Sequence, residues 1–152
     1  MRKILFICTG KTCRSPMAEG LLNHLAESKA LQVQAISAGL HVSETAANDK
    51  AISAAAEHDV DLSHHVPQQL DDALVGEVDL LLTMEGWQKE AVAADFPQAR
   101  DKVHTLLEFA GKQGNVGDPI DGSLDDYRDC ARQVMQAIQG LVDKLSRIEK
   151  PS

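Results

Sequence analysis

The first hydrophobic segment of the chain is an uninterrupted apolar run, Ile4 to Ile7, followed by small and polar residues. Such a run predicts a strand over residues 3–8 that is buried on both faces, as in a parallel sheet covered by helices. From Pro16 to about Ser28 the apolar residues recur at three- and four-residue spacing, which predicts a helix with one apolar face. A second strand is predicted at about 32–37, so a parallel crossover opens the chain.

The remaining sequence repeats this alternation of short apolar runs and helical patterns. Alternating strands and helices predict a doubly wound α/β fold, in which a four-stranded parallel sheet carries helices on both faces. No linker, internal repeat or low-complexity segment interrupts the pattern, so we expect residues 1–152 to form one domain. The further predicted elements are a helix over about 46–58, a strand from Val78 to Leu82, a helix from Glu85 to about Asp95, a strand from Val103 to Leu106, a polar loop over 107–122 and a final helix from Leu124 to about Arg147.

Composition narrows the class of protein without changing this fold. The 152 residues suffice for one hydrophobic core, and 15 basic against 23 acidic side chains give a formal charge of −8. That charge argues against a nucleic-acid partner and favours positively charged ones. No apolar run is long enough for a membrane span or signal peptide, and the three cysteines form no disulfide framework or metal-binding spacing. We therefore expect a cytoplasmic monomer that uses neither membrane nor metal.

The segment between the first strand and the first helix has the composition of an anion-binding loop. Cys8 ends the strand, five residues follow, and Arg14 stands before Ser15 and Pro16, which we expect to be the N-cap and first residue of the helix. Backbone N–H groups of such a loop can surround a tetrahedral oxyanion, while the helix N-terminus and the Arg14 fork add positive charge. The expected phosphate-binding residues are Thr9, Gly10, Lys11, Thr12, Cys13 and Ser15.

Cys8 would lie at the base of this loop, where the N–H groups, the helix dipole and Arg14 all favour its thiolate form. A thiolate that faces a phosphoryl group is an activated nucleophile, and the Ser15 hydroxyl could donate to its sulfur. A lone cysteine at a strand end is more often a small core residue, and a single arginine is more often a surface cation. Their combination in one strand, loop and helix favours catalysis.

Attack by a thiolate requires a group that protonates the leaving atom, and Asp118 is the candidate. Pro119 keeps Asp118 extended, in a loop that leaves the carboxyl edge of the sheet where Cys8 also lies. Taken alone, Asp-Pro is ordinary turn chemistry. Asp121, Asp125 and Asp126 are competing carboxylates, which together with Ser123 are better explained as caps of the last helix.

The segment Cys8 to Glu19, CTGKTCRSPMAE, resembles the signature of the low-molecular-weight protein tyrosine phosphatase family, in the bacterial branch that includes protein arginine phosphatases. Residues 37–39, 63–65, 79–84 and 118–119 also fall where that family has similar residues, so the resemblance covers nearly the whole chain. It implies a cysteine-dependent phosphatase, without metal or cofactor, that acts on phosphorylated proteins or peptides through Cys8, Arg14 and Asp118. It also implies that His65 joins Ser37 in a hydrogen-bond network that braces the loop.

Three positions bear on activity and substrate within this resemblance. Lys11 replaces the asparagine that the family usually carries in the loop, which leaves full activity in question. Thr12 is the residue type of the arginine phosphatases, where tyrosine phosphatases carry a larger aliphatic residue. Ile120 replaces the aromatic residue that stacks on a tyrosine ring. The last two differences favour phosphoarginine as the substrate, with phosphotyrosine as the alternative.

Two other functions stay open from the sequence. A thioredoxin-coupled arsenate reductase would share the loop but needs resolving cysteines in a mobile segment, whereas Cys130 falls in the predicted last helix, where we expect it to pack in the core. A phosphate-binding module without activity is conceivable because of Lys11. For regulation, Cys13 lies five positions from Cys8, so oxidation could join the two in a disulfide that protects the nucleophile.

Overall fold

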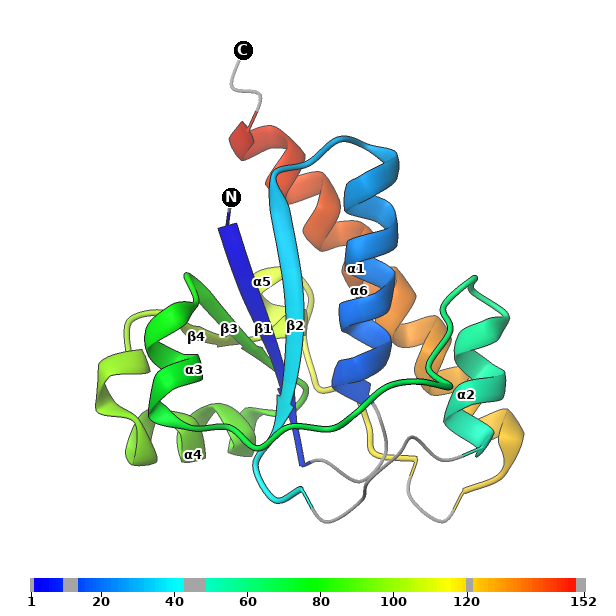
Figure 1. Cartoon of the computed structure of the whole chain (residues 1–152), viewed down its shortest axis with the longest axis horizontal. Coiled ribbons are helices and arrows are strands. Elements are labelled where there is room, and N and C mark those ends of the chain that lie inside the picture. The colour runs from blue at the N-terminus through cyan, green and yellow to red at the C-terminus, as the bar shows by residue number, and fades with distance from the viewer. Residues whose placement is uncertain (1, 10–13, 43–48, 120–121, 150–152) are drawn as a thin grey trace.

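The protein, described by a computed structural model over residues 2–9, 14–42, 49–119 and 122–149, is built on a parallel sheet with strand order β2-β1-β3-β4 (Figure 1). The sheet lies between two layers of helices, and the predicted α/β class is therefore confirmed. The elements are β1 (Arg2–Cys8), α1 (Arg14–Ser28), β2 (Val33–Gly39), α2 (Asp49–Ala56), α3 (Asp72–Glu77), β3 (Leu80–Thr83), α4 (Gly86–Asp95), η1 (Pro97–Ala99), β4 (Val103–Thr105), α5 (Leu106–Phe109) and α6 (Leu124–Glu149).

The two helical layers follow from the apolar run in β1. Successive strand residues point to opposite faces, so Ile4 and Phe6 pack in one core with residues of α1 and α6. Leu5 and Ile7 pack in a second core with residues of α3 and α4. Figure 1 shows α1 and α6 on one side of the sheet and α3 and α4 on the other. A strand buried on both faces needs apolar residues throughout, which is what this run supplies.

All four strands end at the same edge of the sheet. Cys8, the last residue of β1, is in register with Gly39 at the end of β2, and Ile7 is in register with Thr83 at the end of β3. The first turn of α1 lies at this edge as well, whereas the start of β1 and the end of α6 lie at the opposite end of the molecule (Figure 1). The chain therefore leaves the ends of β2 and β3 next to Cys8.

The start of the first helix differs from the prediction. Helix α1 begins at Arg14, so Ser15 and Pro16 lie inside its first turn instead of serving as N-cap and first residue. Proline is tolerated there because the N–H groups of the first turn have no partner within a helix. The Ser15 hydroxyl is consequently available to Cys8.

The α-helices α3 and α5 and the short 3-10 helix η1 were not predicted, and strands β3 and β4 are each one residue shorter than expected. Leu106 begins α5 instead of ending a strand, because the Thr105 side chain accepts from the Glu108 N–H and the Glu108 side chain accepts from the Thr105 N–H. Helix α3 begins after Asp71, whose side chain accepts a hydrogen bond from the Leu74 N–H. The remaining predicted strand and helix bounds agree with the structure to within a few residues.

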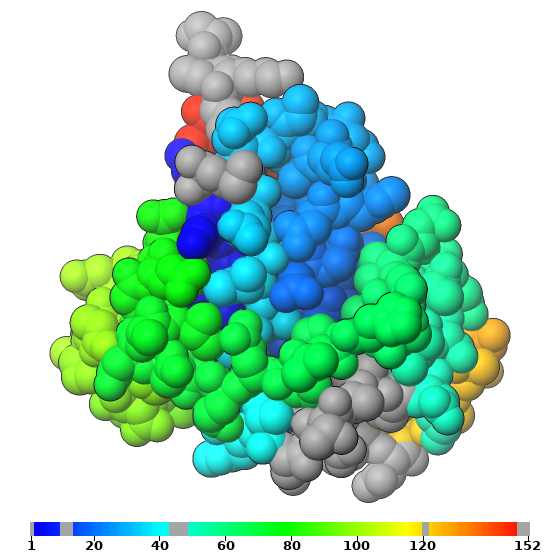
Figure 2. Space-filling model, viewed as in Figure 1, coloured from blue at the N-terminus to red at the C-terminus, as the bar shows by residue number. Residues whose placement is uncertain are grey.

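The segment between α2 and α3 covers part of the outer edge of β2. Gly39 donates its N–H to the Gln68 carbonyl and accepts from the Leu70 N–H, both at 2.9 Å. Figure 2 shows this segment crossing the face of the molecule between the two helices. Over the residues that the structure describes, no helix is long and apolar enough to cross a membrane, and no three His, Cys, Asp or Glu side chains are arranged to hold a metal ion.

Candidate active site

Cys8 ends the central strand β1 with its side chain buried, and its neighbour is the Ser15 hydroxyl. The Cys8 Sγ and Ser15 Oγ atoms are 3.0 Å apart, and Ser15 Oγ also donates to the Ala38 carbonyl at 3.4 Å. With a neutral thiol, Cys8 can donate to Ser15 while Ser15 donates to Ala38. With a thiolate, Ser15 must turn its proton to the sulfur. The pair can therefore stabilise both protonation states of Cys8.

Arg14, the first residue of α1, carries a guanidinium that is completely buried. Its Nη1 atom donates to the Glu85 carboxylate at 2.9 Å and to the Val116 carbonyl at 2.8 Å. Within the part of the chain that the structure describes, its Nε and Nη2 atoms make no hydrogen bond. Burying unpaired donors on a cation is costly unless a ligand completes them. The free side of the fork therefore has the chemistry of a site for a bidentate anion.

Glu85 is a site residue that the sequence analysis missed. It lies two residues after the end of β3 and serves as the N-cap of α4, and its side chain accepts a hydrogen bond from Arg14, 71 positions away in the sequence. The buried Gln88 supports it, because Gln88 Oε1 accepts the N–H groups of Met84 and Glu85, each at 3.0 Å. Its place at the carboxyl end of a predicted strand was the one signal in the sequence.

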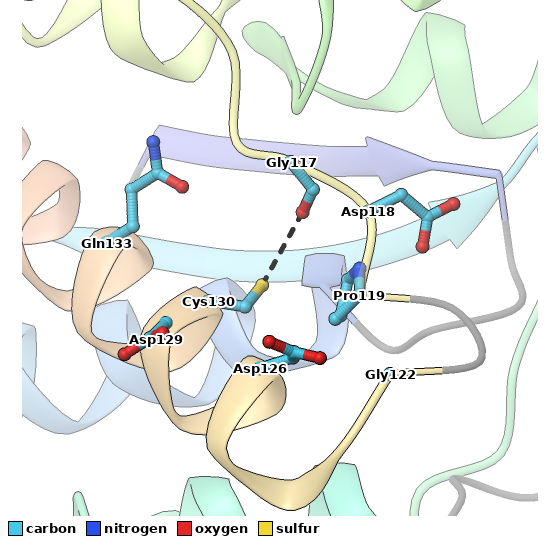
Figure 3. Close-up of a pocket in the computed structure, with 8 residues that line it drawn as sticks. All are labelled: Gly117, Asp118, Pro119, Gly122, Asp126, Asp129, Cys130 and Gln133. Carbon is cyan, nitrogen blue, oxygen red and sulfur yellow. Dashed lines mark hydrogen bonds between the residues drawn. The ribbon is translucent and has the colours of Figure 1, made fainter.

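Asp118 reaches the same guanidinium from the loop between α5 and α6. Its Oδ2 atom lies 3.6 Å from Arg14 Nη2, and its side chain is partly exposed. The loop is anchored just before it, since Val116 donates its N–H to the Met84 carbonyl at 2.9 Å and Cys130 Sγ donates to the Gly117 carbonyl at 3.8 Å. In Figure 3 the carboxyl group of Asp118 points away from Cys130. The structure thus places Ser15 beside Cys8 and Asp118 beside Arg14.

A hollow of about 300 Å³ lies beside this acid loop. Burial raises the pKa of the Cys130 thiol in its wall to about 11. A thiol with so high a pKa and so little exposure is a poor redox partner, which argues against the arsenate reductase alternative. The core position expected for Cys130 is confirmed. The hollow is lined by Gly117, Asp118, Pro119, Gly122, Asp126, Asp129, Cys130 and Gln133 (Figure 3).

The expected pairing of Ser37 with His65 is not formed in the described part of the chain. The Ser37 hydroxyl donates to the Glu19 carboxylate of α1 at 3.2 Å. The half-buried His65 lines the same second hollow, of about 460 Å³, as Ser37 and Glu19. Partial burial lowers the pKa of His65, which favours the neutral ring. Ser37 and His65 therefore line the same hollow, but the hydrogen-bond partner of Ser37 is Glu19 and not the expected His65.

Several predicted residues lie outside the described part of the chain: Gly10, Lys11, Thr12, Cys13, Ile120 and Asp121. Thr9 is described, and its buried hydroxyl has no hydrogen-bond partner in the described structure, a second unpaired polar group next to Cys8. At the start of α6, Ser123 Oγ accepts from the Asp126 N–H and Asp126 accepts from the Ser123 N–H. The predicted capping role of Ser123 is therefore confirmed.

Comparison with known proteins gives the same picture over nearly the full chain. The model of a family described as low molecular weight phosphotyrosine protein phosphatase matches residues 3–150. The protein-arginine-phosphatase of Bacillus subtilis (strain 168) is 38% identical over 146 residues, which cover 95% of this chain and 97% of that protein. A probable low molecular weight protein-tyrosine-phosphatase, EpsP of Ralstonia nicotianae, is 32% identical over 146 residues, with 95% and 97% covered.

Solved structures agree with these sequence matches. A structure of the YwlE arginine phosphatase, in which the active-site cysteine is replaced by a phosphorylated serine, has a TM-score of 0.90 to this fold at 37% identity. The match covers 95% of this chain and 96% of that one.

Proposed function

Because the chain belongs to the low molecular weight phosphotyrosine protein phosphatase family, we propose that it hydrolyses phosphorylated protein side chains, phosphoarginine in preference to phosphotyrosine, through a phosphocysteine on Cys8. Membership of this family makes the protein a hydrolase that uses a cysteine nucleophile. We also propose that residues 1–152 form one domain, which the family match over residues 3–150 supports.

The observation that carries this proposal is that the Nε and Nη2 donors of Arg14 make no hydrogen bond in the described structure. A fully buried guanidinium with two nitrogen atoms that make no hydrogen bond in the described structure, next to a buried cysteine, is costly in a structural core and useful in an oxyanion site. The planar fork matches two equatorial oxygens of a phosphoryl group. We assign Arg14 to holding these oxygens in the ground state and in the transition state.

In the first step, the Cys8 thiolate attacks phosphorus while the bond from phosphorus to the leaving nitrogen or oxygen breaks. Asp118 donates its proton to that leaving atom, so the substrate side chain departs neutral. The 3.6 Å separation between Asp118 and Arg14 keeps the acid close to the phosphoryl site. The product of this step is a phosphocysteine and an ionised Asp118.

In the second step, Asp118 takes a proton from water, whose oxygen bonds to phosphorus as the bond from phosphorus to sulfur breaks. The departing sulfur regains its negative charge. Ser15, 3.0 Å from Cys8 Sγ, can donate its hydroxyl proton in a hydrogen bond to that charge. Inorganic phosphate leaves, and both Asp118 and Cys8 return to their starting states.

The preference for phosphoarginine rests on relatives and on Thr12. Two of the proteins that resemble this chain are named protein-arginine-phosphatases, at 38% and 35% identity. We expect a threonine at position 12 to leave more space than a larger aliphatic residue and to offer its hydroxyl group to the nitrogen-linked phosphoryl group. Phosphotyrosine is the second candidate, since EpsP relatives at 32% identity are named as protein-tyrosine-phosphatases.

Two variants test the chemistry on an aryl phosphate. Cys8→Ser should abolish turnover, because serine is a far weaker nucleophile at neutral pH. Asp118→Asn should reduce kcat/KM by roughly 10²- to 10⁴-fold on a poor leaving group and much less on a good one. A Cys8→Ser protein as active as wild type would overturn the mechanism.

A separate comparison tests the substrate. We expect a higher kcat/KM on phosphoarginine peptides than on phosphotyrosine peptides of matched sequence, and we expect Thr12→Ile to shift the ratio toward phosphotyrosine. Discrimination by one methyl group is worth about 1–3 kcal/mol, so some phosphotyrosine activity should survive in wild type. A wild type that prefers phosphotyrosine, with no change in Thr12→Ile, would contradict the assignment.

A further inference from the structure

The two sides of Asp118 are anchored differently in the acid loop. Before Asp118, Val116 is completely buried. Its N–H donates to the carbonyl of Met84, just after β3, and its carbonyl accepts from Arg14, at the start of α1. After Asp118, Gly122 donates its N–H to the Pro119 carbonyl at 2.8 Å, which closes the turn from Pro119 to Gly122. The position of the acid thus depends on how Pro119 and Gly122 are held.

A lysine from a different element reaches the end of that turn. Lys50, in the first turn of α2, donates from Nζ to the Gly122 carbonyl at 2.6 Å. A hydrogen bond from a charged donor is stronger than one between neutral groups. The contact joins residues 72 positions apart in the sequence, so it links α2 directly to the turn that follows Asp118.

Gly122, which Lys50 contacts, has close neighbours on the side where a side chain would lie. A Cβ atom placed on Gly122 would lie 2.7 Å from Asp126 Oδ2 and 2.8 Å from the Pro119 carbonyl oxygen. A side chain at position 122 would displace these neighbours, so Gly122 is packed closely against Pro119 and Asp126 of α6. Figure 3 shows Gly117, Asp118 and Pro119 next to one another on the loop, and Gly122 before the start of α6. A displacement at Gly122 would therefore be transmitted to Pro119 and to Asp118.

The helix that bears Lys50 is itself held firmly. Ala51, Ala54 and Ala55 of α2 are buried in the core that α6 also lines. Beyond the end of α2, Glu57 accepts from Arg128 of α6 at 2.8 Å. Lys50 consequently extends from a fixed support to Gly122.

We propose that Lys50 is a positioning residue for the general acid. Its ammonium group holds Gly122, Gly122 holds the Pro119 carbonyl, and these contacts keep Asp118 in place to protonate the leaving atom. The proposal rests on the acid role of Asp118 proposed above. Lys50 contacts neither substrate nor Cys8 in this account and acts through the loop alone. Its loss should impair proton donation and leave nucleophilic attack intact, because small displacements of a catalytic group cost much rate.

The test uses kcat/KM on two aryl phosphates, since this constant reports the step in which the leaving group departs. Phenyl phosphate has a poor leaving group that needs an acid, and p-nitrophenyl phosphate has a good one that hardly does. Lys50→Met should lower kcat/KM about tenfold on phenyl phosphate and less than about twofold on p-nitrophenyl phosphate. Lys50→Arg, which keeps a cationic donor, should restore most of the loss. Lys29→Met, at an exposed lysine beyond the end of α1, is the charge-matched control and should change neither value.

A double variant separates a role in acid catalysis from a general one. In an Asp118→Asn background there is no proton to position, so adding Lys50→Met should cause no further loss on phenyl phosphate. Equal losses on the two substrates, no loss on either, or an undiminished loss in the Asp118→Asn background would each overturn the role of Lys50. If instead Asp118→Asn alone lost no more on phenyl phosphate than on p-nitrophenyl phosphate, the acid assignment itself would fall. Thermal unfolding of each variant checks that the fold persists, and Lys50→Gln repeats the test with a polar replacement.

Discussion

Arg14 divides its donors between the protein and the open side of the site. Nη1 donates to Glu85 and to the Val116 carbonyl, whereas Nε and Nη2 make no hydrogen bond within the described structure, and Nη2 is only 3.6 Å from Asp118 Oδ2. A cation held on one side only keeps its orientation without an anion and still offers two donors to a phosphoryl group. Glu85 also adds a negative charge next to a site for negative substrates. It should therefore favour orientation at some cost in anion affinity.

This balance predicts the behaviour of Glu85→Gln. The amide can still accept from Arg14, but the negative charge beside the anion site is gone, so the inhibition constant of inorganic phosphate should fall by about 3- to 30-fold. We expect kcat to fall, because a neutral acceptor orients the guanidinium less firmly. Inhibition of aryl phosphate hydrolysis by phosphate measures both effects.

Glu77→Gln is the matched control for this prediction. It removes one carboxylate that pairs with Lys3 at a surface site, and it should leave phosphate inhibition unchanged. An unchanged phosphate constant in Glu85→Gln would show that Glu85 does not influence the anion site electrostatically.

At the same scale, sequence predicted the residues that are close in the chain or that follow strand ends. Cys8, Arg14 and Ser15 lie within one strand, loop and helix, so local geometry predicts their meeting. Asp118 follows from the rule that loops after parallel strands share an edge. The Arg14 contact to Glu85 spans 71 positions and depends on side-chain direction at a helix N-cap, which no local pattern encodes. The predicted pairing of Ser37 with His65 is not formed among the described residues, where the Ser37 hydroxyl donates to Glu19 of α1 instead. This contact too joins separate elements and has no local pattern in the sequence.

At the scale of elements, α1 completes the exposed edge of β2. Asn23 bonds both main-chain groups of Ala35, accepting from its N–H at 2.8 Å and donating to its carbonyl at 3.0 Å. Glu19, one turn earlier, accepts from Ser37 two residues further along the strand. An i, i+4 pair on one helix thus matches alternate residues of the strand. Unpaired edges invite association with other chains, and this pairing closes part of the edge.

The buried Glu19 carboxyl affects the free energy of unfolding in a way that depends on pH. Burial raises the pKa of its carboxyl above the ordinary value of 4.5, although hydrogen bonds from Ser37 oppose the shift. Asp61, His64 and His65 line the same hollow and are the other titratable groups that face it. A raised pKa means that the folded state binds the proton more tightly than the unfolded state, so stability falls as pH rises through the raised value.

Glu19→Gln should therefore gain stability over wild type as pH rises. Below pH 4.5 the wild-type carboxyl is protonated in the folded state, and the two proteins should have similar free energies of unfolding. Toward pH 7 the glutamine, which keeps an acceptor for Ser37, avoids a poorly solvated charge and should be the more stable form. Denaturant unfolding across this pH range measures the difference. Glu27→Gln, an exposed residue of the same helix, is the control, and a constant or reversed difference would contradict the expectation.

Element prediction succeeded where periodicity extends over several turns and failed for short pieces. Helix α6 and strand β1 have long apolar patterns, and both lie where they were expected. Helices α3 and α5 span one or two turns, too short for a period to emerge. The sequence signals for these two helices are their caps. Asp71 caps α3, and Thr105 with Glu108 forms a capping box for α5. The capping box lies where the apolar pattern predicts a strand followed by a loop.

At the scale of the whole molecule, the sheet gathers the proposed reacting groups at one edge, while the net charge is a property of the whole chain. The order β2-β1-β3-β4 places β1 centrally, so Cys8 is flanked by the ends of β2 and β3. The formal charge of −8 is a property of the composition and was available from the sequence. Its effect on a charged substrate acts over distance and does not depend on the identity of single contacts.

The charge leads to a prediction about protein substrates. Phosphopeptides with several lysines should be attracted to the enzyme, and phosphopeptides with several glutamates should be repelled, because the enzyme has a formal charge of −8. Raising the ionic strength from about 0.01 M to about 0.1 M shortens the screening length from about 30 Å to about 10 Å. We therefore expect kcat/KM to fall with salt for the basic peptide and to rise for the acidic one, with kcat nearly constant for both. The same phosphorylated residue in both peptides serves as the internal control for effects of salt on the chemistry. Parallel salt dependence for the two peptides would show that the net charge of the enzyme does not steer its substrates.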